Sequence, residues 1–208
     1  MDERYTAFTK LSPTTVADVL TREWVMDGGI RPLWPGMPRV AGPAYPVRCP
    51  PGDNLMVHAA IYRAAPGAVI VVEAGDTAFA IAGGNVCRVA QKRGVAAFVV
   101  DGVIRDVAEA RENQFPVFAR GVSPIPGTKD AVGILNGPIR CGGVAVGPGD
   151  IVVADEEGIV VVPADRAEAV LRAATAKAAR DAAETLEAWE AAHHARIEAI
   201  LKQKGFPG

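Results

Sequence analysis

Residues 83–113 read GGNVCRVAQKRGVAAFVVDGVIRDVAEAREN, and this stretch indicates the fold of the chain. A glycine turn opens a short helix that we expect to stop at Gly94. The apolar run VAAFVV has the length of a buried strand, and DVAEAREN predicts a further helix. A second apolar run, AVIVVEA at 68–74, precedes the glycine turn. Continuous apolar strands that alternate with helices are typical of parallel strands covered by helices.

The segments on either side extend this pattern. LSPTTVADVLTREW at 11–24 predicts a first helix with Ser12 as its N-cap. DNLMVHAAIYRAAPG at 53–67 predicts a second helix capped by Asp53, and a strand is expected before it at Arg39–Val47. The second half of the chain contains several short apolar runs between Gly and Pro turns, which indicate antiparallel or barrel-like sheet. The sequence therefore predicts a mixed α/β domain with a βαβαβ core.

The tail from Asp165 to about Lys204 predicts one long helix rich in alanine. Asp165 and Glu168 have the spacing of a capping pair. A helix of about 40 residues is longer than a domain of this size needs to cover its core. Two interpretations stay open: the helix reaches a neighbouring subunit, or it lies across its own sheet.

Composition excludes several classes of protein. The 208 residues include 22 basic and 24 acidic ones, so the net charge is −2, and 50% are hydrophobic. This length indicates one domain, and no basic block suggests a nucleic-acid partner. The charged N-terminus lacks the apolar core of a signal peptide, and no run of about 18 apolar residues could span a membrane. Three scattered cysteines outside any CxxC pair argue against disulfides and zinc. We therefore expect a cytoplasmic protein.

Arg105 and Asp106 follow the apolar strand, and two interpretations of this pair are open. Asp106 and Glu109 have the spacing of a capping box. Alternatively, the pair lies past the carboxyl end of a strand, where open α/β sheets bind ligands. The loop AGGN at 82–85 also opens a helix, so its N–H groups would suit an anion. An arginine beside them suits a carboxylate, and Asp106 suits a hard divalent cation.

Other chemically reactive residues are weaker candidates. His58 could line a cleft from its helix, although a single histidine on an apolar helix is more often packed in place. His193 and His194 are adjacent on the tail and are expected to be solvated. Cys87 lies at a helix start, which could lower its pKa, but no histidine is near it in sequence. The AGGN loop is not the GxGxxG pattern of dinucleotide sites.

The quoted stretch, continued to residue 124, resembles the class II pyruvate aldolases that act on 4-hydroxy-4-methyl-2-oxoglutarate and 4-carboxy-4-hydroxy-2-oxoadipate. That family is similar in fold to the regulator of ribonuclease activity A (RraA). IRPLWPGMPRVAGPAYPV, GDNLMVHAAI and GDIVVADEEGIVVVP resemble its other hallmarks, and the likeness spans roughly residues 12–185. The resemblance implies an RraA-like α/β/β sandwich, similar to swivelling domains, with a long C-terminal helix.

The resemblance also implies roles for the candidate residues. Asp106 would be the direct protein ligand of Mg²⁺ or Mn²⁺, with waters completing the coordination. Arg105 would neutralise the enolate that forms when the carbon–carbon bond breaks. The pyruvate carboxylate would bind to backbone amides of the loop formed by Gly83, Gly84, Asn85 and Val86. Because the metal acts as a Lewis acid, no Schiff-base lysine is required.

One position departs from the family pattern. The aldolases carry an acidic residue where this chain has Gly84, and that acid would order the metal-bound waters that move protons. A general acid–base group is worth about 10²–10⁴ in rate. Asp76 or Glu73 could substitute from the preceding loop. The family also takes an acidic residue from a neighbouring subunit's C-terminal helix, for which Asp181 is the best match.

Two functions remain in competition. The first is a metal-dependent lyase that releases pyruvate from a 4-hydroxy-2-oxo acid by retro-aldol cleavage and can also decarboxylate oxaloacetate. The second is a non-catalytic binding protein of the RraA type that acts by protein–protein contact. The Arg105–Asp106 pair favours the lyase, and Gly84 favours the binding protein or an enzyme with a changed substrate. The resemblance further implies a homotrimer or hexamer.

Overall fold

The computed structural model describes residues 3–206 and is built around one large sheet. Its strand order is β1-β5-β4-β3-β2-β9-β10, with β6 paired to β2. The strands are β1 (Arg31–Pro32), β2 (Val40–Arg48), β3 (Val69–Glu73), β4 (Ala97–Ile104), β5 (Val117–Val122), β6 (Ile134–Leu135), β9 (Ile151–Asp155) and β10 (Gly158–Val162). Strands β2 to β5 are parallel, whereas β1, β6, β9 and β10 pair antiparallel with their neighbours. The predicted parallel core is confirmed. In the second half, β6, β9 and β10 are antiparallel as expected, whereas β5 pairs parallel with β4.

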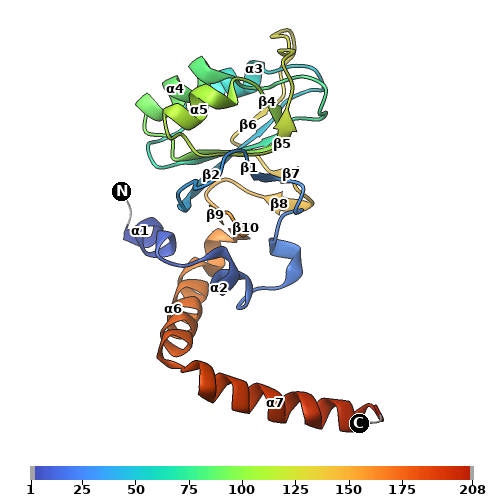
Figure 1. Cartoon of the computed structure of the whole chain (residues 1–208). Helices are drawn as coiled ribbons and strands as arrows, with labels where there is room; N and C mark the ends of the chain where they lie inside the picture. The colour runs from blue at the N-terminus through green and yellow to red at the C-terminus, as the bar shows by residue number, and fades with distance from the viewer. Residues whose placement is uncertain (1–2, 207–208) are drawn as a thin grey trace. The chain divides into compact units, whose positions relative to one another are not determined.

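Two layers cover the central strands (Figure 1). Helices α3 (Leu55–Ala60), α4 (Gly84–Lys92) and α5 (Val107–Glu112) lie on one face, and the hairpin of β7 (Ile139–Cys141) and β8 (Val144–Val146) lies on the other. Alternate residues of β4 enter different apolar clusters, since Phe98 packs toward the helices and Val99 toward the hairpin. Burial on both faces explains why β3 and β4 are continuously apolar. The α/β/β layering expected from the resemblance is present.

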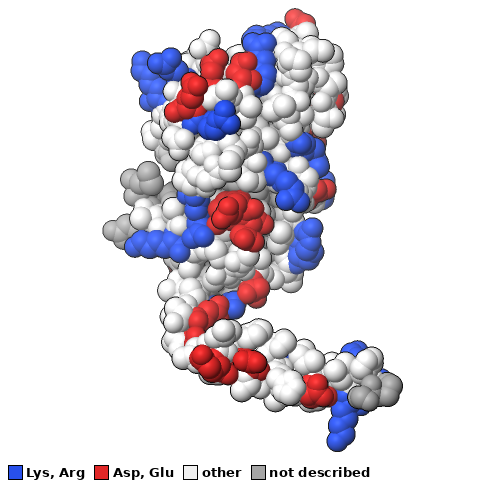
Figure 2. Space-filling model, viewed as in Figure 1, with Lys and Arg blue, Asp and Glu red and all other residues white. Residues whose placement is uncertain are grey.

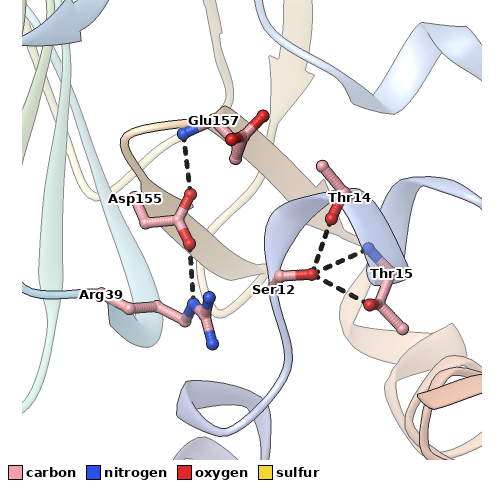
Figure 3. Close-up of polar contacts among 6 residues, drawn as sticks. All are labelled: Ser12, Thr14, Thr15, Arg39, Asp155 and Glu157. Carbon is pink, nitrogen blue, oxygen red and sulfur yellow. Dashed lines mark hydrogen bonds and ion pairs between the residues drawn. The ribbon is translucent and has the colours of Figure 1, made fainter. Parts of the chain in front are cut away.

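The first predicted helix is shorter than its sequence pattern. Helix α1 (Glu3–Thr9) precedes it, α2 covers only Pro13–Ala17, and a 3₁₀ turn follows at Arg22–Trp24. Ser12 is the N-cap as expected, because its hydroxyl accepts a hydrogen bond from the Thr15 amide at 3.1 Å (Figure 3). The segment contains three threonines and two valines, whose helix propensity is low, so it does not sustain a longer helix.

An ion pair fixes the antiparallel hairpin to the start of β2. The Nε of Arg39 lies 2.8 Å from Oδ2 of Asp155, whose side chain is 8% exposed. The other oxygen of Asp155 accepts from the Glu157 amide at 2.9 Å, across the β9–β10 turn (Figure 3). This carboxylate therefore has a structural role within the segment GDIVVADEEGIVVVP.

The prediction of one continuous helix over 165–204 is wrong. The tail contains α6 (Ala167–Ala183) and α7 (Leu186–Gln203), and Thr185 caps α7 by accepting from the Ala188 amide at 3.2 Å. A capping threonine with extended backbone competes with helix continuation at this point. The expected capping pair at the start of the tail is also absent from the described residues, since a 3₁₀ turn at Ala164–Arg166 occupies that position.

The chain forms two compact units, one through Ala174 and one from Thr175 onward. The second unit holds the end of α6 and all of α7, and no described residue of α7 is buried. Leu186, Trp189 and Ile200 are exposed there. Among residues 3–206, no helix is both long and apolar enough to cross a membrane. On the face that Figure 2 shows, acidic and basic side chains are intermingled over α4 and α5.

Gly42 of β2 lies where the packing leaves no room for a side chain. A Cβ at this position would lie 2.2 Å from the carbonyl oxygen of Gly67, which is backbone and cannot move aside easily. We expect Gly42→Ala to lower the free energy of unfolding by about 1–3 kcal/mol, as overpacking does. Urea denaturation measures this change. Gly121→Ala in β5 is the matched control, because a Cβ there meets nothing within 4 Å; equal stability of both variants would contradict the prediction.

Candidate functional site

The glycine loop and the end of β4 lie side by side. The Ile81 amide donates to the carbonyl of Val103 at 3.0 Å, and the Arg105 amide donates to the carbonyl of Ala82 at 2.9 Å. These bonds extend the parallel pairing of the sheet beyond its regular strands. Because each segment then opens a helix, the starts of α4 and α5 meet at the carboxyl edge of the sheet, as expected for a ligand site.

Asp106 does not cap its own helix. It has φ 58° and ψ 39°, a left-handed conformation, and its side chain makes no capping hydrogen bond to α5. Instead its Oδ2 accepts from the Gly84 amide at 3.0 Å, across the loop. Left-handed backbone is unusual for a residue other than glycine and concentrates at functional sites. The capping-box interpretation of Asp106 is therefore wrong, and the carboxylate faces the start of α4.

Arg105 lies beside this carboxylate without being buried. Its Nε is 3.4 Å from Oδ2 of Asp106, and the two side chains are 43% and 39% exposed. An ion pair with this exposure adds little to stability. The guanidinium therefore remains available to a bound anion.

The start of α4 offers backbone donors to the same space. The first intrahelical bond runs from the Cys87 amide to the Gly83 carbonyl, so the amides of residues 84–86 precede it and lack helical partners. Asp106 takes the Gly84 amide. No hydrogen bond within residues 3–206 engages the amides of Asn85 and Val86, and they lie at the end of the helix that favours negative charge.

Glu109 occupies the space above Gly84. A Cβ at Gly84 would lie 1.8 Å from Oε2 of Glu109, and a Cβ at Gly83 would lie 2.5 Å from Oδ2 of Asp106. Two carboxylates thus cover the two glycines. The missing acid at Gly84 does not leave the cleft without a second carboxylate, because Glu109 supplies one from α5.

These groups line one cleft with residues from two other segments. Its lining residues are Asn54, His58, Ala80, Ala82, Gly83, Asn85, Val86, Arg105, Asp106, Glu109, Pro126 and Lys129. Its volume is about 130 Å³, which on the same measure holds several waters, since one needs about 10–15 Å³. The cleft therefore suits a small ligand with its hydration. The predicted residues among its lining are His58, Gly83, Asn85, Val86, Arg105 and Asp106, whereas Gly84, Glu73, Asp76 and Asp181 are not among them.

His58 lies on the α3 side of the cleft and is half-buried. Burial lowers the pKa of His58, and the charge of Lys129 lowers it further, against the opposing effect of Asp53. The imidazole is therefore neutral at neutral pH and can donate or accept a hydrogen bond.

Asp53 links the start of α3 to the loop that carries Lys129. Its Oδ1 accepts from the Leu55 amide at 2.8 Å, and its Oδ2 accepts from the Thr128 hydroxyl and the Asp130 and Ala131 amides. Burial by itself would raise the pKa of Asp53, but these hydrogen bonds lower it overall. The N-cap position belongs to Asn54, which makes no side-chain capping bond, so Asp53 is not the N-cap that the sequence predicted. Asp53 instead holds the loop that carries Lys129 against the start of α3.

The alternative acids lie elsewhere. The carboxylate of Asp76 accepts from the amides of Gly52, Ala78 and Phe79 and faces a different cavity. Glu73 faces that second cavity too, where its carboxylate pairs with Arg48 at 2.8 Å. Neither side chain lies with Arg105 and Asp106. Within the C-terminal unit, Asp181 pairs with Lys177 at 2.9 Å.

Cys87 is not an activated thiol. Burial raises its pKa to about 12, and the nearby charge of Asp106 acts in the same direction. This effect outweighs the helix start, which by itself would lower the pKa.

The sequence-based interpretation missed Glu109, Asn54 and Lys129 as lining residues. The position of Glu109, three residues after Asp106, could have indicated a second carboxylate at the site, but the same spacing is typical of a helix cap. Asn54 and Lys129 are far from residue 106 in sequence, and no local pattern joins them to it.

A model of the family described as "RraA-like: Aldolase/RraA" matches residues 13–161. The chain belongs to the Aldolase/RraA family. A Halalkalibacterium halodurans protein named "Putative 4-hydroxy-4-methyl-2-oxoglutarate aldolase" is 42% identical over 179 residues, which cover 86% of this chain and 85% of that one.

Solved structures of Aldolase/RraA proteins share the fold. Streptomyces coelicolor RraAS2, described as an unusual member of the RNase ES inhibitor RraA family, has a TM-score of 0.75 at 30% identity, over 84% of this chain and 91% of its own. The RNA-processing inhibitor RraA of Thermus thermophilis has a TM-score of 0.66 at 29% identity, over 72% and 91%. The family therefore contains relatives that are named as aldolases and relatives that are named as inhibitors of ribonuclease or RNA processing.

Proposed function

We propose that this Aldolase/RraA protein is a divalent-metal-dependent lyase that cleaves a 4-hydroxy-2-oxo acid to pyruvate by a retro-aldol reaction. The observation that carries the proposal is the convergence of Arg105, Asp106 and Glu109 with the unpaired amides of Asn85 and Val86 in one cleft. The aldolase name of the Halalkalibacterium halodurans relative supports it.

The donor set fits a hard cation that keeps most of its water. No group of three or more His, Cys, Asp or Glu side chains among the described residues could hold a metal by itself. Asp106 would be the direct ligand and Glu109 would contact the coordinated waters, a pattern that Mg²⁺ and Mn²⁺ accept because they bind oxygen. When bound, the metal would polarise the 2-oxo group of the substrate as a Lewis acid.

The protein's own groups have separable roles in the proposed reaction. The amides of Asn85 and Val86 would bind the C1 carboxylate. Arg105 would stabilise the negative charge that develops on the 2-oxo oxygen as the C3–C4 bond breaks. Glu109 would take up the proton of the C4 hydroxyl, directly or through one water, and return of a proton to C3 would convert the enolate to pyruvate. The same enolate arises when C4 leaves as carbon dioxide, so we also propose oxaloacetate decarboxylation.

We further propose that the C-terminal unit packs against another copy of the chain in a homotrimer or hexamer, with Asp181 facing the neighbour's cleft. The support is the exposure of Leu186, Trp189 and Ile200 on α7, a helix in which no described residue is buried. Light scattering that shows a mass near 22 kDa at micromolar concentration would contradict this assembly.

Pyruvate release tests the proposed function. With Mg²⁺ or Mn²⁺ supplied, the protein is expected to release pyruvate from 4-hydroxy-4-methyl-2-oxoglutarate and from oxaloacetate, and excess chelator should abolish both. A coupled lactate dehydrogenase assay measures the release. If a folded protein releases pyruvate from neither substrate, the alternative function is favoured: a non-catalytic regulator like the inhibitor-named relatives.

A further inference from the structure

Helix α7 has an apolar side that no other part of the described chain covers. No described residue of α7 is buried, and Leu186, Trp189 and Ile200 are 73%, 47% and 38% exposed. The rings of Trp189 and His193 stack with their centroids 4.5 Å apart, so part of this side is already ordered. Helices in proteins gain most of their stability from the packing of an apolar face. A helix of 18 residues without a buried side chain therefore indicates a partner that covers it.

The apolar side of α7 has a symmetric spacing. Its members follow one another in steps of three, four, four and three residues, and they are Leu186, Trp189, His193, Ile197 and Ile200. Steps of three or four residues return to the same side of an α-helix, and this order is the same from either end. When two helices pair antiparallel about a two-fold axis, a residue before the axis meets one equally far after it. With the axis at His193, Leu186 of one copy would lie opposite Ile200 of the other, and Trp189 would likewise meet Ile197.

The charges along the tail favour the antiparallel direction. Residues 181–190 contain four acidic and no basic side chains, whereas residues 196–204 contain three basic side chains and one acidic. Figure 2 shows acidic side chains near the start of α7 and basic ones near its end. Antiparallel pairing brings the acidic part of each copy to the basic part of the other, whereas parallel pairing sets like charges side by side. A parallel coiled coil also needs alternating steps of three and four residues, which would put Arg196 into the contact in place of Ile197.

A hollow at the junction of α6 and α7 offers space for the end of the second helix. Its volume is about 460 Å³, and it is lined by Lys177, Asp181, Glu184, Thr185, Leu186 and Trp189. The register about His193 brings the residues after Ile200 of a second copy over this junction. Those residues include Leu201, Lys202, Lys204 and Phe206, and Phe206 is 63% exposed. Apolar and acidic groups of the hollow would therefore meet apolar and basic groups of the helix end.

We propose that α7 pairs antiparallel with α7 of a second copy of the chain, about a two-fold axis at His193. The last turn of each helix lies over the α6–α7 junction of the other copy. The contact is isologous, because each copy contributes both a hollow and a helix end. This inference rests on the association of copies proposed above and not on the lyase activity. Added to a trimer, the contact joins two trimers into a hexamer.

Light scattering on two matched variants tests the pairing. Ile200→Glu puts a charge into the proposed contact, so it should lower the mass of the wild-type assembly about twofold. Ala199→Glu adds the same charge at an exposed neighbouring position outside the contact, and it should keep the wild-type mass. Circular dichroism shows whether each variant keeps its helices. Equal masses of the two variants, or a wild-type mass near the 21.7 kDa of one chain, would overturn the pairing.

Mass and activity are independent measurements, so the pairing and the proposed function can fail separately. If the protein releases no pyruvate but Ile200→Glu halves the mass, only the lyase assignment fails. If pyruvate is released and the two variants have equal masses, the pairing fails and the lyase assignment stands.

Disulfide cross-linking tests the direction and the register of the helices. Packed helices with axes about 8–10 Å apart bring facing Cα atoms to about 4–6 Å, within reach of a disulfide. After oxidation, the double variant Leu186→Cys/Ile200→Cys should form a covalent dimer on a non-reducing gel, and neither single variant should. The wild type is the control, since Cys49, Cys87 and Cys141 are buried. A covalent dimer of Leu186→Cys alone would overturn the antiparallel direction, and absence of a dimer in the double variant would overturn the register.

Discussion

Asp106→Asn is expected to lower both pyruvate-releasing activities by about 10³-fold or more. Loss of Lewis-acid polarisation removes several kcal/mol of transition-state stabilisation, and each 1.36 kcal/mol is a factor of ten. The asparagine can still accept the hydrogen bond that Asp106 accepts from the Gly84 amide, so the loop should keep its shape. Calorimetric binding of Mn²⁺ should disappear in the same variant.

The control for this experiment is Asp165→Asn, which changes an exposed carboxylate outside the cleft. It should leave activity and Mn²⁺ affinity unchanged. Unchanged Mn²⁺ affinity in a folded Asp106→Asn protein would rule out Asp106 as the metal ligand. Asp106 would then have a structural role alone, through the hydrogen bond that it accepts from the Gly84 amide.

Glu109→Gln is expected to reduce retro-aldol cleavage by about 10²–10⁴-fold, the range of a general acid–base group. Oxaloacetate decarboxylation should fall much less, because that substrate has no C4 hydroxyl proton to remove. Glu112→Gln, on the same short helix and outside the cleft, is the matched control and should be neutral. Equal loss of both activities in Glu109→Gln would argue against a role in proton removal.

The carboxylate of Glu109 also determines the expected effect of Gly84→Asp. From the sequence, Gly84→Asp adds a missing acid, but in the structure a Cβ there lies 1.8 Å from Oε2 of Glu109. The single substitution should therefore lower activity. In a Glu109→Ala background the space is open, so Gly84→Asp should restore part of the lost retro-aldol rate. A gain from Gly84→Asp with Glu109 present would contradict this arrangement of the two residues.

Patterns in the sequence determined the central architecture. Strands β3 and β4 were predictable because burial on both faces demands continuous apolar runs. The stop at Gly94 was predictable because its φ of +83° favours glycine. The position of Arg105 and Asp106 followed from where parallel strands end. These are local requirements, and each is visible in a few adjacent residues.

Only the tertiary structure decided what the residues around the pair do. The spacing of Asp106 and Glu109 fits a helix cap, and what excludes the cap is the left-handed backbone of Asp106, which turns its carboxylate to Gly84. Asn54 and Lys129 join the cleft because Asp53, a buried carboxylate, binds two segments about 75 residues apart in the sequence. The break before α7 depends on whether Thr185 caps or continues a helix, and propensity alone favours neither. These features depend on hydrogen bonds and steric contacts between residues far apart in the sequence. Such contacts produce no periodic pattern from which they could be predicted.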